Sequence, residues 1–297
     1  MGERSGGKYL VASRMLVRKG RLGLRRIIFG AIYLMYREQV NCCPACTSTD
    51  VESFSKVRWH LSFLKLVRCK SCKFIWQSPR LSKRGLDFFY QKLYRSRKSS
   101  AELESLYQRG RRRGAYILNF VRSAALVRKP KLVVEIGCGY GGIMDRFQTW
   151  ADEVIGYDID PKACQFAQMK GLQVRQGDIE AVRENGIDVF LCSHVLEHVV
   201  DPIRFLTSVV SKLSRPGLIY IEVPGVENPK VVEDNFGVQP GHLHYFTRQT
   251  LEACCKKADL DIVKINDKIQ VVAIPKGGLS LDLAKNKLTQ NSMEVLA

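Results

Sequence analysis

The sequence predicts an α/β fold, in which a mostly parallel sheet is covered by helices on both faces and follows a small N-terminal module. From Lys131 onward, short stretches rich in Val and Ile alternate with helical stretches, as in chains of β–α–β units. Two CxxC motifs stand ahead of that point and predict a metal-binding module. Charge divides the chain at the same place: residues 1–130 hold 29 Lys and Arg against 7 Asp and Glu, whereas residues 131–297 hold 18 against 22. The basic half therefore suits an anionic partner, although a well-solvated surface is the simpler alternative.

Residues 1–40 are predicted to be a basic amphipathic leader, with a helix over residues 14–39. Such a helix could lie on an anionic membrane surface, pack on the domain, or lie along an RNA groove. Its longest apolar run, residues 27–36, is too short to cross a membrane, and no small-residue cleavage site follows it. Cysteines arranged as CxxC pairs in a long chain indicate a reducing compartment. The expected location is therefore the cytoplasm, with contact at the inner face of the membrane left open.

Residues 41–80 are predicted to form a zinc-ribbon-like module. Each CxxC motif can form a tight turn that brings two thiolates to one ion, and two such turns complete a tetrahedral site. Because all four positions are filled by sulfur, the expected ion is a structural Zn²⁺ and not a catalytic one. A redox dithiol or a chance arrangement remains the alternative. The predicted ligands are Cys43, Cys46, Cys69 and Cys72.

Residues 81–130 are predicted to form a helical linker or lid. Tyr90 and Tyr94 are expected either to close over an acceptor or to pack as ordinary helix residues. The run RGRRRG at 109–114 is a possible contact for a polyanion.

The sheet domain is predicted over residues 131–276, followed by a polar tail at 277–297. The last two strands are close together and are expected to pair as a hairpin. The expected strands are residues 131–137, 153–159, 172–177, 187–193, 218–224, 261–267 and 270–276. The expected helices are residues 142–150, 161–171 and 201–217, of which the last begins at Asp-Pro and stops at Pro-Gly.

The first strand of the domain ends in a glycine-rich loop, VVEIGCGYGG at 133–142. Its glycines let the backbone turn sharply and approach a ligand closely. The pattern differs from the dinucleotide motif GxGxxG, because the third glycine, Gly141, comes one residue early. Asp158 ends the second strand, where a carboxylate can bind both ribose hydroxyls. Asp178 follows the third strand, at the adenine end of the same crevice.

These residues, together with DVFLCSHVLEHVVDP at 188–202, resemble the class I S-adenosylmethionine (SAM)-dependent methyltransferases. The resemblance covers most of residues 131–275 and implies a Rossmann-like seven-stranded sheet of order 3-2-1-4-5-7-6 with an antiparallel seventh strand. It implies that the glycines approach the methionine part of SAM, that Glu135 orients its amino group indirectly, and that Asp158 holds the ribose. The implied cofactor-binding residues are Glu135, Gly137, Gly139, Gly141, Asp158, Asp178, Ile179, Ser193 and His194.

The N-terminal half and the stretch EVPG…GHLHYFTRQTL are similar to bacterial methyltransferases associated with surface polysaccharides and sugars. Among these, the deoxysugar C-methyltransferases carry a YxEH pattern three residues ahead of a Tyr-Phe pair. His242 and His198 match their two site histidines, but Gln239 and Gly241 replace the tyrosine and the glutamate. These departures favour methylation of a hydroxyl over methylation of carbon.

A sugar hydroxyl is weakly acidic, so its methylation requires a general base, and a neutral imidazole can serve near pH 7. His242 is the first candidate for the base and His198 the second, with His194 and His244 behind them. Segment 224–246, which contains His242, is too long for a plain connection and is expected to form a substrate lid.

The leading hypothesis is thus a SAM-dependent methyltransferase that acts on a small acceptor, most simply a nucleotide- or lipid-linked saccharide. An RNA methyltransferase whose basic half binds the phosphate backbone is the enzymatic alternative. A non-catalytic SAM-binding or scaffold protein is the third reading. The intact set of cofactor residues disfavours that third reading.

Overall fold

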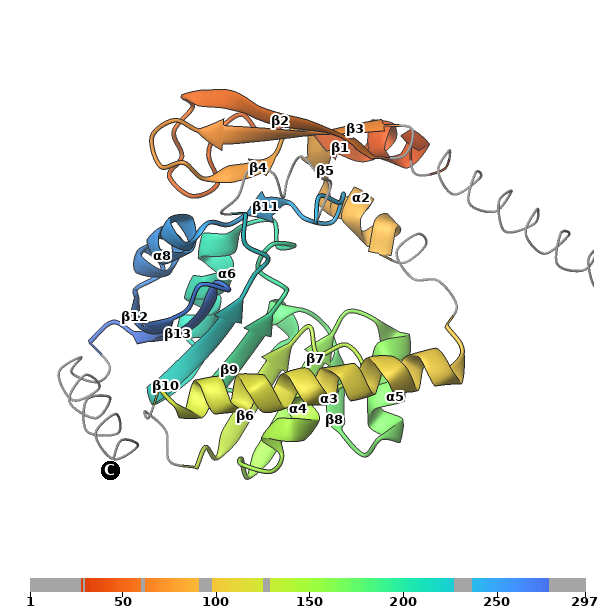
Figure 1. Ribbon diagram of the computed structural model, residues 1–297, viewed down its shortest axis with the longest axis vertical. Coiled ribbons are helices and arrows are strands. Elements are labelled where there is room, and N and C mark those ends of the chain that lie inside the picture. The colour runs from red at the N-terminus through yellow and green to blue at the C-terminus, as the bar shows by residue number, and fades with distance from the viewer. Residues whose placement is uncertain are drawn as a thin grey trace, which may run out of the picture.

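The computed structural model describes residues 28, 30–59, 62–90, 98–124, 129–226 and 237–277 (Figure 1). Most of the predicted leader, Tyr94, part of the predicted lid at 224–246 and nearly all of the predicted tail lie outside the described residues. Among the residues that are described, no helix is both long enough and apolar enough to cross a membrane.

A seven-stranded sheet forms the larger part of the molecule, in the order β12-β13-β10-β9-β6-β7-β8. Numbered along the sheet domain, this order is 3-2-1-4-5-7-6, and β13 runs antiparallel to both neighbours, which confirms the expected topology. The predicted terminal hairpin is also confirmed. The strands are β6 (Leu132–Ile136), β7 (Glu153–Asp158), β8 (Gln173–Gln176), β9 (Ile187–Ser193), β10 (Leu213–Glu222), β12 (Leu260–Ile265) and β13 (Gln270–Pro275).

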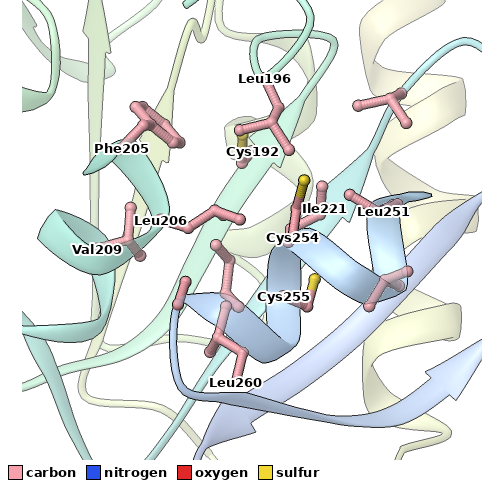
Figure 2. Packing of buried hydrophobic residues seen from close by; sticks show 14 of the residues in the cluster. Cys192, Leu196, Phe205, Leu206, Val209, Ile221, Leu251, Cys254, Cys255 and Leu260 are labelled. Carbon is pink, nitrogen blue, oxygen red and sulfur yellow. The ribbon is translucent and has the colours of Figure 1, made fainter. Parts of the chain in front are cut away.

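Helices cover both faces of this sheet, because successive residues of its strands point to opposite faces and both sets are apolar. Val133 packs with α3, α4 and α5, whereas its neighbour Val134 packs with α6 and α8. Figure 2 shows the second face, where Leu206 of α6 and Leu251 of α8 belong to one apolar cluster over the sheet. The helices are α3 (Ser100–Arg122), α4 (Gly142–Phe147), α5 (Pro161–Met169), the 3₁₀ turn η2 (Ile179–Ala181), α6 (Pro202–Val210) and α8 (Arg248–Lys257).

The helix predicted over 201–217 begins as expected but ends early. Asp201 caps it, since its side chain accepts from the backbone N–H of Arg204. The helix stops at Val210, and β10 already begins at Leu213, so the predicted stop at Pro-Gly is wrong. Pro216 and Gly217 instead lie at an irregularity in the β9–β10 pairing, where a strand tolerates a missing N–H. A Cβ on Gly217 would lie 2.5 Å from the Ile187 carbonyl oxygen, so close pairing with β9 requires glycine there.

Two further local expectations also fail. The leader helix is not continuous to residue 39, because residues 37–38 form strand β1 (Arg37–Glu38), which pairs with β5 (Arg80–Leu81). His198 does not begin a helix; it lies in a turn four residues before α6.

A second, four-stranded sheet lies over one end of the large sheet, in the order β11-β4-β3-β2 (Figure 1). Three of its strands come from the cysteine-containing segment, but β11 comes from residues that follow β10 by more than twenty positions. Leu243 and Tyr245 pack into the same core as Leu64 and Leu66, so the two parts of the chain are built together. These elements are β2 (Val51–Trp59), β3 (Ser62–Cys69), β4 (Ile75–Gln77), β11 (His244–Tyr245) and helix α2 (Lys83–Phe88).

Candidate active site

The glycine-rich loop between β6 and α4 forms a tight, open-sided turn. Gly137 and Gly139 have φ angles of 68° and 54°, a region that other residues rarely adopt. A Cβ on Gly137 would lie 2.4 Å from Val195, whereas nothing lies within 4 Å of a Cβ on Gly139. Gly141 precedes α4 and places the N-terminus of that helix beside the loop. The sequence motif therefore folds into a backbone cradle at the carboxyl end of β6.

Asp158 at the end of β7 is fixed against this loop. Its Oδ2 accepts from the backbone N–H of Gly139 at 2.9 Å, and its Oδ1 accepts from that of Asp160 at 2.7 Å. Each carboxylate oxygen has a second lone pair, so the fixed group can still accept from a ribose hydroxyl. Asp178 follows β8, is exposed, and caps η2 through the backbone N–H of Glu180, with Ile179 next to it.

Glu135 is buried below the loop with its Oε2 unpartnered among the described residues. Burial raises the pKa of this carboxyl to about 8, against the opposing effects of the Met144 backbone N–H and the Arg113 charge. An unpaired buried carboxyl next to a glycine cradle fits a ligand that carries a positively charged amino group, as the methionine part of SAM does. The residues present thus fit the cofactor that the sequence predicts.

A cluster of polar side chains continues the site across the ends of β9 and β10. Glu222 Oε2 accepts from Ser193 Oγ at 3.0 Å and from Tyr220 at 2.8 Å, and it pairs with Arg113 Nη2 at 2.6 Å. Burial opposes ionisation of Glu222, but the Arg113 guanidinium, His194 and the hydrogen bond from Tyr220 together outweigh it and lower the pKa of the carboxyl. His194 lies beside this group, with an unusual φ of 55° and its Nε2 at 3.8 Å from Glu222.

Arg113 is a site residue that the sequence analysis did not single out. It belongs to the run RGRRRG, which α3 contains, and α3 brings it to Ser193, 80 positions away. Arg111 of the same run pairs with Asp145 at 2.7 Å. Two of the arginines are therefore engaged inside the protein, so the run is not a continuous basic surface for a polyanion.

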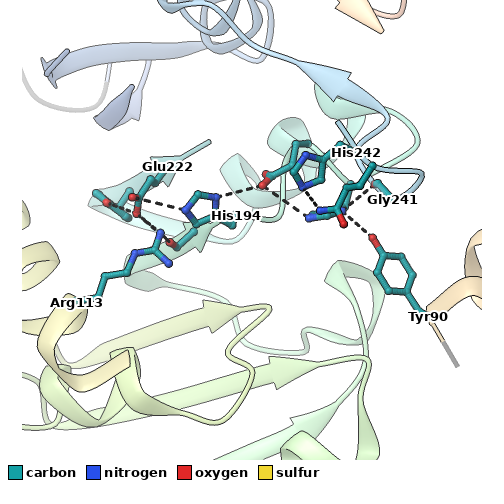
Figure 3. A network of polar contacts seen from close by, with 11 residues as sticks. Tyr90, Arg113, His194, Glu222, Gly241 and His242 are labelled. Atoms are coloured by element: carbon teal, nitrogen blue, oxygen red, sulfur yellow. Dashed lines mark hydrogen bonds and ion pairs between the residues drawn. The ribbon is translucent and has the colours of Figure 1, made fainter. Parts of the chain in front are cut away.

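Glu197 is the second residue that was missed, and it links the two groups of histidines. His194 Nδ1 lies 3.3 Å from Glu197 Oε1, and His198 Nε2 lies 3.7 Å from the same oxygen. Burial alone would raise the pKa of Glu197, but the hydrogen bond from His194 and the charges of His198 and His242 lower it. Polar contacts consequently run from Arg113 through Glu222 and His194 to His242 and Tyr90 (Figure 3). The only sequence signal was the Glu-His pair inside LEH.

His198 has a defined neutral form. Its Nδ1 lies 2.8 Å from the Gly241 carbonyl oxygen and 2.7 Å from the Tyr90 hydroxyl. Because a carbonyl oxygen only accepts, these partners assign the ring hydrogen to Nδ1. The lone pair of the neutral ring is then on Nε2, which faces Glu197.

His242 stands beside His198, with ring centroids 4.7 Å apart, but its Nε2 is already engaged. Gln239 Nε2 lies 2.6 Å from His242 Nε2, so this ring nitrogen accepts, and the Gly237 backbone also acts on the ring as a hydrogen-bond partner. Burial, together with the charge of His198, lowers the pKa of His242 to about 4.

His244 is a core residue. It is 1% exposed, its Nε2 donates to the Val199 carbonyl at 2.9 Å, and its ring packs against Phe74 and Phe246. Burial and the nearby Arg80 lower its pKa to about 3. The two histidines of GHLHYFT face different surroundings, since only His244 belongs to β11.

Glu197, His198 and His242 each place a ligand atom within 4.8 Å of the other two. Glu197 Oε2 is buried and has no partner among the described residues. One carboxylate and two imidazoles suit a transition-metal cation as well as proton transfer. A cation would have to displace Gln239 from His242 Nε2, however, so the existing hydrogen bonds favour proton transfer.

The four predicted zinc ligands lie together, in the turn before β2 and in the turn from β3 to β4. The Sγ atoms of Cys43 and Cys72, and those of Cys46 and Cys69, are 3.5 Å apart, near the roughly 3.8 Å separation of a tetrahedral zinc site. The two turns are alike: a backbone N–H returns to the carbonyl of the first cysteine in each. The residue after the second cysteine, Thr47 or Lys73, has a φ of 64° in both turns. The donor set and spacing fit Zn²⁺.

Comparison with known proteins places this geometry in context. A family model described as "Methyltransferase domain" matches residues 107–265, more than half of the chain. The "Ubiquinone biosynthesis O-methyltransferase" of Cereibacter sphaeroides is 34% identical over 116 residues, 36% of this chain and 47% of that protein. The protein of the same name from Nitrosospira multiformis is 28% identical over 141 residues, 44% of this chain and 56% of that protein. The chain thus spans about half the length of the curated relatives it matches.

Among solved structures, SAM-bound CalS10 of Micromonospora echinaspora, described as an amino pentose methyltransferase, aligns with a TM-score of 0.48 and 14% identity. The alignment covers 62% of this chain and 100% of CalS10.

Proposed function

Because this chain belongs to the methyltransferase-domain family and is a SAM-dependent methyltransferase, we propose that it methylates a hydroxyl oxygen of a small acceptor. The relatives of known name are O-methyltransferases, which supports oxygen as the receiving atom. The acceptor we propose is a sugar hydroxyl on a nucleotide- or lipid-linked saccharide. The basic first 130 residues would then face its phosphate groups.

The observation that carries the proposal is the position of His198 against Glu197, at the end of β9 and beside the cofactor cradle. Bound SAM supplies a methyl group whose bond to sulfur breaks as a bond to the acceptor oxygen forms. His198 Nε2 has the lone pair that would take the hydroxyl proton, and Glu197 Oε1, 3.7 Å away, would stabilise the resulting imidazolium. A positioned base of this kind contributes about 10²–10⁴-fold to a rate.

This proposal moves the base from His242, the first candidate from sequence, to His198. Nε2 of His242 already accepts from Gln239, and the low pKa of His242 makes it a weak base. Its role is instead to form one wall of the acceptor site next to His198, 4.7 Å away between ring centroids.

The glycine cradle and the polar cluster suggest which residue would contact each part of SAM. Asp158 would accept from the ribose hydroxyls, and the Glu135 carboxyl would lie opposite the amino group of SAM and pair with its positive charge. Arg113 would face the carboxylate of the methionine part, since its guanidinium lies at Ser193 and Glu222. Asp178 and Ile179 would border the adenine, and Ser193 and His194 the methionine chain.

We also propose a structural Zn²⁺ on Cys43, Cys46, Cys69 and Cys72. Four thiols within reach of one ion, two of them fully buried, fit this cation better than four unrelated thiols. The proposed ion has no role in the chemical step.

Transfer of tritium from methyl-labelled SAM tests the function. The acceptors are a mixture of nucleoside-diphosphate hexoses, 3,4-dihydroxybenzoate, and bulk RNA, and SAM affinity is measured by calorimetry. We expect label in the hexose fraction as an alkali-stable ether. Label in RNA alone, with binding that weakens steeply as salt rises, would instead establish the RNA alternative.

The base is tested by His198→Asn and His242→Asn. Asparagine keeps a donor near the Nδ1 position but has nothing at Nε2. We expect His198→Asn to lose about 100-fold or more in turnover at unchanged SAM affinity, and His242→Asn to lose under about tenfold. The reverse order of the two losses would return the base to His242.

A further inference from the structure

Gln77 of β4 reaches from the cysteine-containing sheet into the active site. Its side chain is 0% exposed, and its Nε2 lies 2.7 Å from the Gln239 carbonyl and 2.6 Å from the His242 carbonyl. The Tyr245 hydroxyl lies 3.1 Å from the same nitrogen. Two carbonyl acceptors require the amide nitrogen, and not its oxygen, to face them, so the orientation of the amide is defined.

The two carbonyls belong to the ends of one turn, Gln239–His242. The turn is closed by the backbone N–H of His242, which donates to the Gln239 carbonyl at 3.0 Å. Gln77 therefore spans the turn from outside and holds both ends, while its own backbone N–H donates to the Leu243 carbonyl at 2.9 Å. The two hydrogens of the primary amide can serve both backbone carbonyls at once, and the more distant Tyr245 hydroxyl lies beside them.

The third residue of the same turn, Gly241, faces the catalytic side. Its carbonyl is the acceptor that assigns the His198 hydrogen to Nδ1, at 2.8 Å. The turn has little freedom on that side, because a Cβ on Gly241 would lie 2.6 Å from the Tyr90 hydroxyl. One turn thus joins Gln77 on one side to His198 on the other.

We infer that Gln77 is a positioning residue for methyl transfer, which fixes the Gln239–His242 turn so that Gly241 holds His198 with its Nε2 lone pair free. The inference rests on the proposed function of His198. If Gln77 has this role, the cysteine-containing sheet forms a wall of the active site and is not a separate module, as the pairing of β4 with β11 also indicates. No other side-chain type of similar length offers two hydrogens without a charge at this buried position.

Release of the turn would also change the surroundings of His242. Four titratable groups face His242: His194, Glu197 and His198 from the turn after β9, and Tyr245 of β11. The Tyr90 hydroxyl in turn contacts His198. Burial is the main cause of the low pKa of His242, so access of water would raise this pKa from about 4 toward the ordinary value. A change of this kind is specific to positioning and does not follow from a loss of stability alone.

The test is nitrogen-15 NMR of the imidazoles in full-length protein bound to S-adenosylhomocysteine. The variants are Gln77→Met, which keeps the length and removes the donor, and Gln77→Asn, which keeps the amide and shortens its reach. Ser78→Ala is the matched control, because Ser78 is an adjacent buried polar residue that bonds Val40 and not the turn.

We expect the wild-type His198 to carry its hydrogen on Nδ1. In both Gln77 variants we expect the Nε2–H form to be populated and His242 to titrate at higher pH, while Ser78→Ala matches the wild type. A wild-type His198 with its hydrogen on Nε2, or unchanged spectra in a folded Gln77 variant, would overturn the inference. The measurement needs no turnover, so its outcome is separate from the outcome of the methyl-transfer assay.

Discussion

Nε2 of His198 lies 3.7 Å from Oε1 of Glu197, while its Nδ1 is held by the Gly241 carbonyl. The two residues are adjacent in sequence, and the turn between β9 and α6 brings both side chains to the same side. A neutral imidazole with one nitrogen fixed and the other beside a buried carboxylate is arranged to accept a proton and to keep it as a stabilised cation. The first prediction follows from this pair.

Glu197→Gln should slow methyl transfer about 10–100-fold, because the imidazolium loses its ionic partner while the shape of the site is kept. Single-turnover rates with SAM in excess measure the effect, and SAM affinity should change little. Glu252→Gln, which removes an exposed carboxylate paired with Arg248 on α8, is the control and should be neutral. Equal rates for the wild type and Glu197→Gln would exclude the pair from the chemistry.

Glu197→Gln should also change how stability depends on pH. The pKa of Glu197 is lowered in the folded protein, so the carboxylate stabilises the fold above its unfolded pKa and this contribution is lost as pH falls through the folded pKa. The melting temperature of the variant should therefore lie below that of the wild type at pH 7. The gap should close in the acidic range below the unfolded value of about 4.3. A gap that stays constant from pH 7 to the acidic range would contradict the assigned ionisation.

Arg113→Ala should weaken SAM binding about 10–100-fold, the value expected when one hydrogen bond to a charged group is lost. Calorimetry with SAM measures the change, and Arg113→Lys should recover only part of it, because lysine lacks the planar fork. Arg112→Ala is the matched control, since Arg112, the neighbour of Arg113 in the same helix, is exposed. Equal losses for both alanine variants would show a general effect of charge and not a contact.

The local pattern of the sheet domain could be predicted from sequence because its signals are short-range. The short runs rich in Val and Ile, the glycine loop and the Asp-Pro cap each act within a few positions. The end of the helix after Asp201 could not be predicted, because it is decided by where β10 pairs with β9 and not by the Pro-Gly pair. The strand order followed from the resemblance to a family, and not from the spacing of the strands.

Much of the candidate site depends on contacts between distant parts of the chain. Arg113 meets Ser193 across 80 positions, and Gln77 meets His242 across 165. No periodicity encodes such pairs, and both residues lie in segments whose composition suggested other uses. The choice between His242 and His198 depends on hydrogen-bond partners, such as Gln239 and Gly241, that sequence motifs do not contain.

Glu135→Gln should stabilise the cofactor-free protein at neutral and alkaline pH. The pKa of Glu135 is raised to about 8 in the folded state, so stability falls as pH rises from the unfolded pKa to about 8, where the folded protein must ionise a buried group. The melting temperature of the variant should exceed that of the wild type by a margin that grows between about pH 4.5 and 8. The variant should also bind SAM more weakly, because the carboxyl that opposes the amino group is gone. A margin independent of pH would contradict the raised pKa.

Purified protein should contain about one zinc ion per chain, and Cys46→Ser should abolish it. A structural zinc site contributes its binding energy to folding, so the variant and a chelator-treated sample should both melt at lower temperature. Metal analysis by mass spectrometry and thermal unfolding measure the two effects. Cys42→Ser is the control, because Cys42 is exposed and adjacent to the ligands but outside the cluster.

Loss of this metal should lower the activity of the active site, even though the ion is not catalytic. Cys69 ends β3, and the turn that follows leads directly into β4, whose last residue is Gln77. A looser turn at Cys69–Cys72 should therefore loosen the Gln239–His242 turn, which Gln77 holds. Turnover should fall more than SAM affinity, because the cofactor cradle belongs to the other sheet. Turnover and SAM affinity that fall together would point instead to general unfolding. A wild-type protein free of metal, with all four thiols open to alkylation, would contradict the zinc assignment itself.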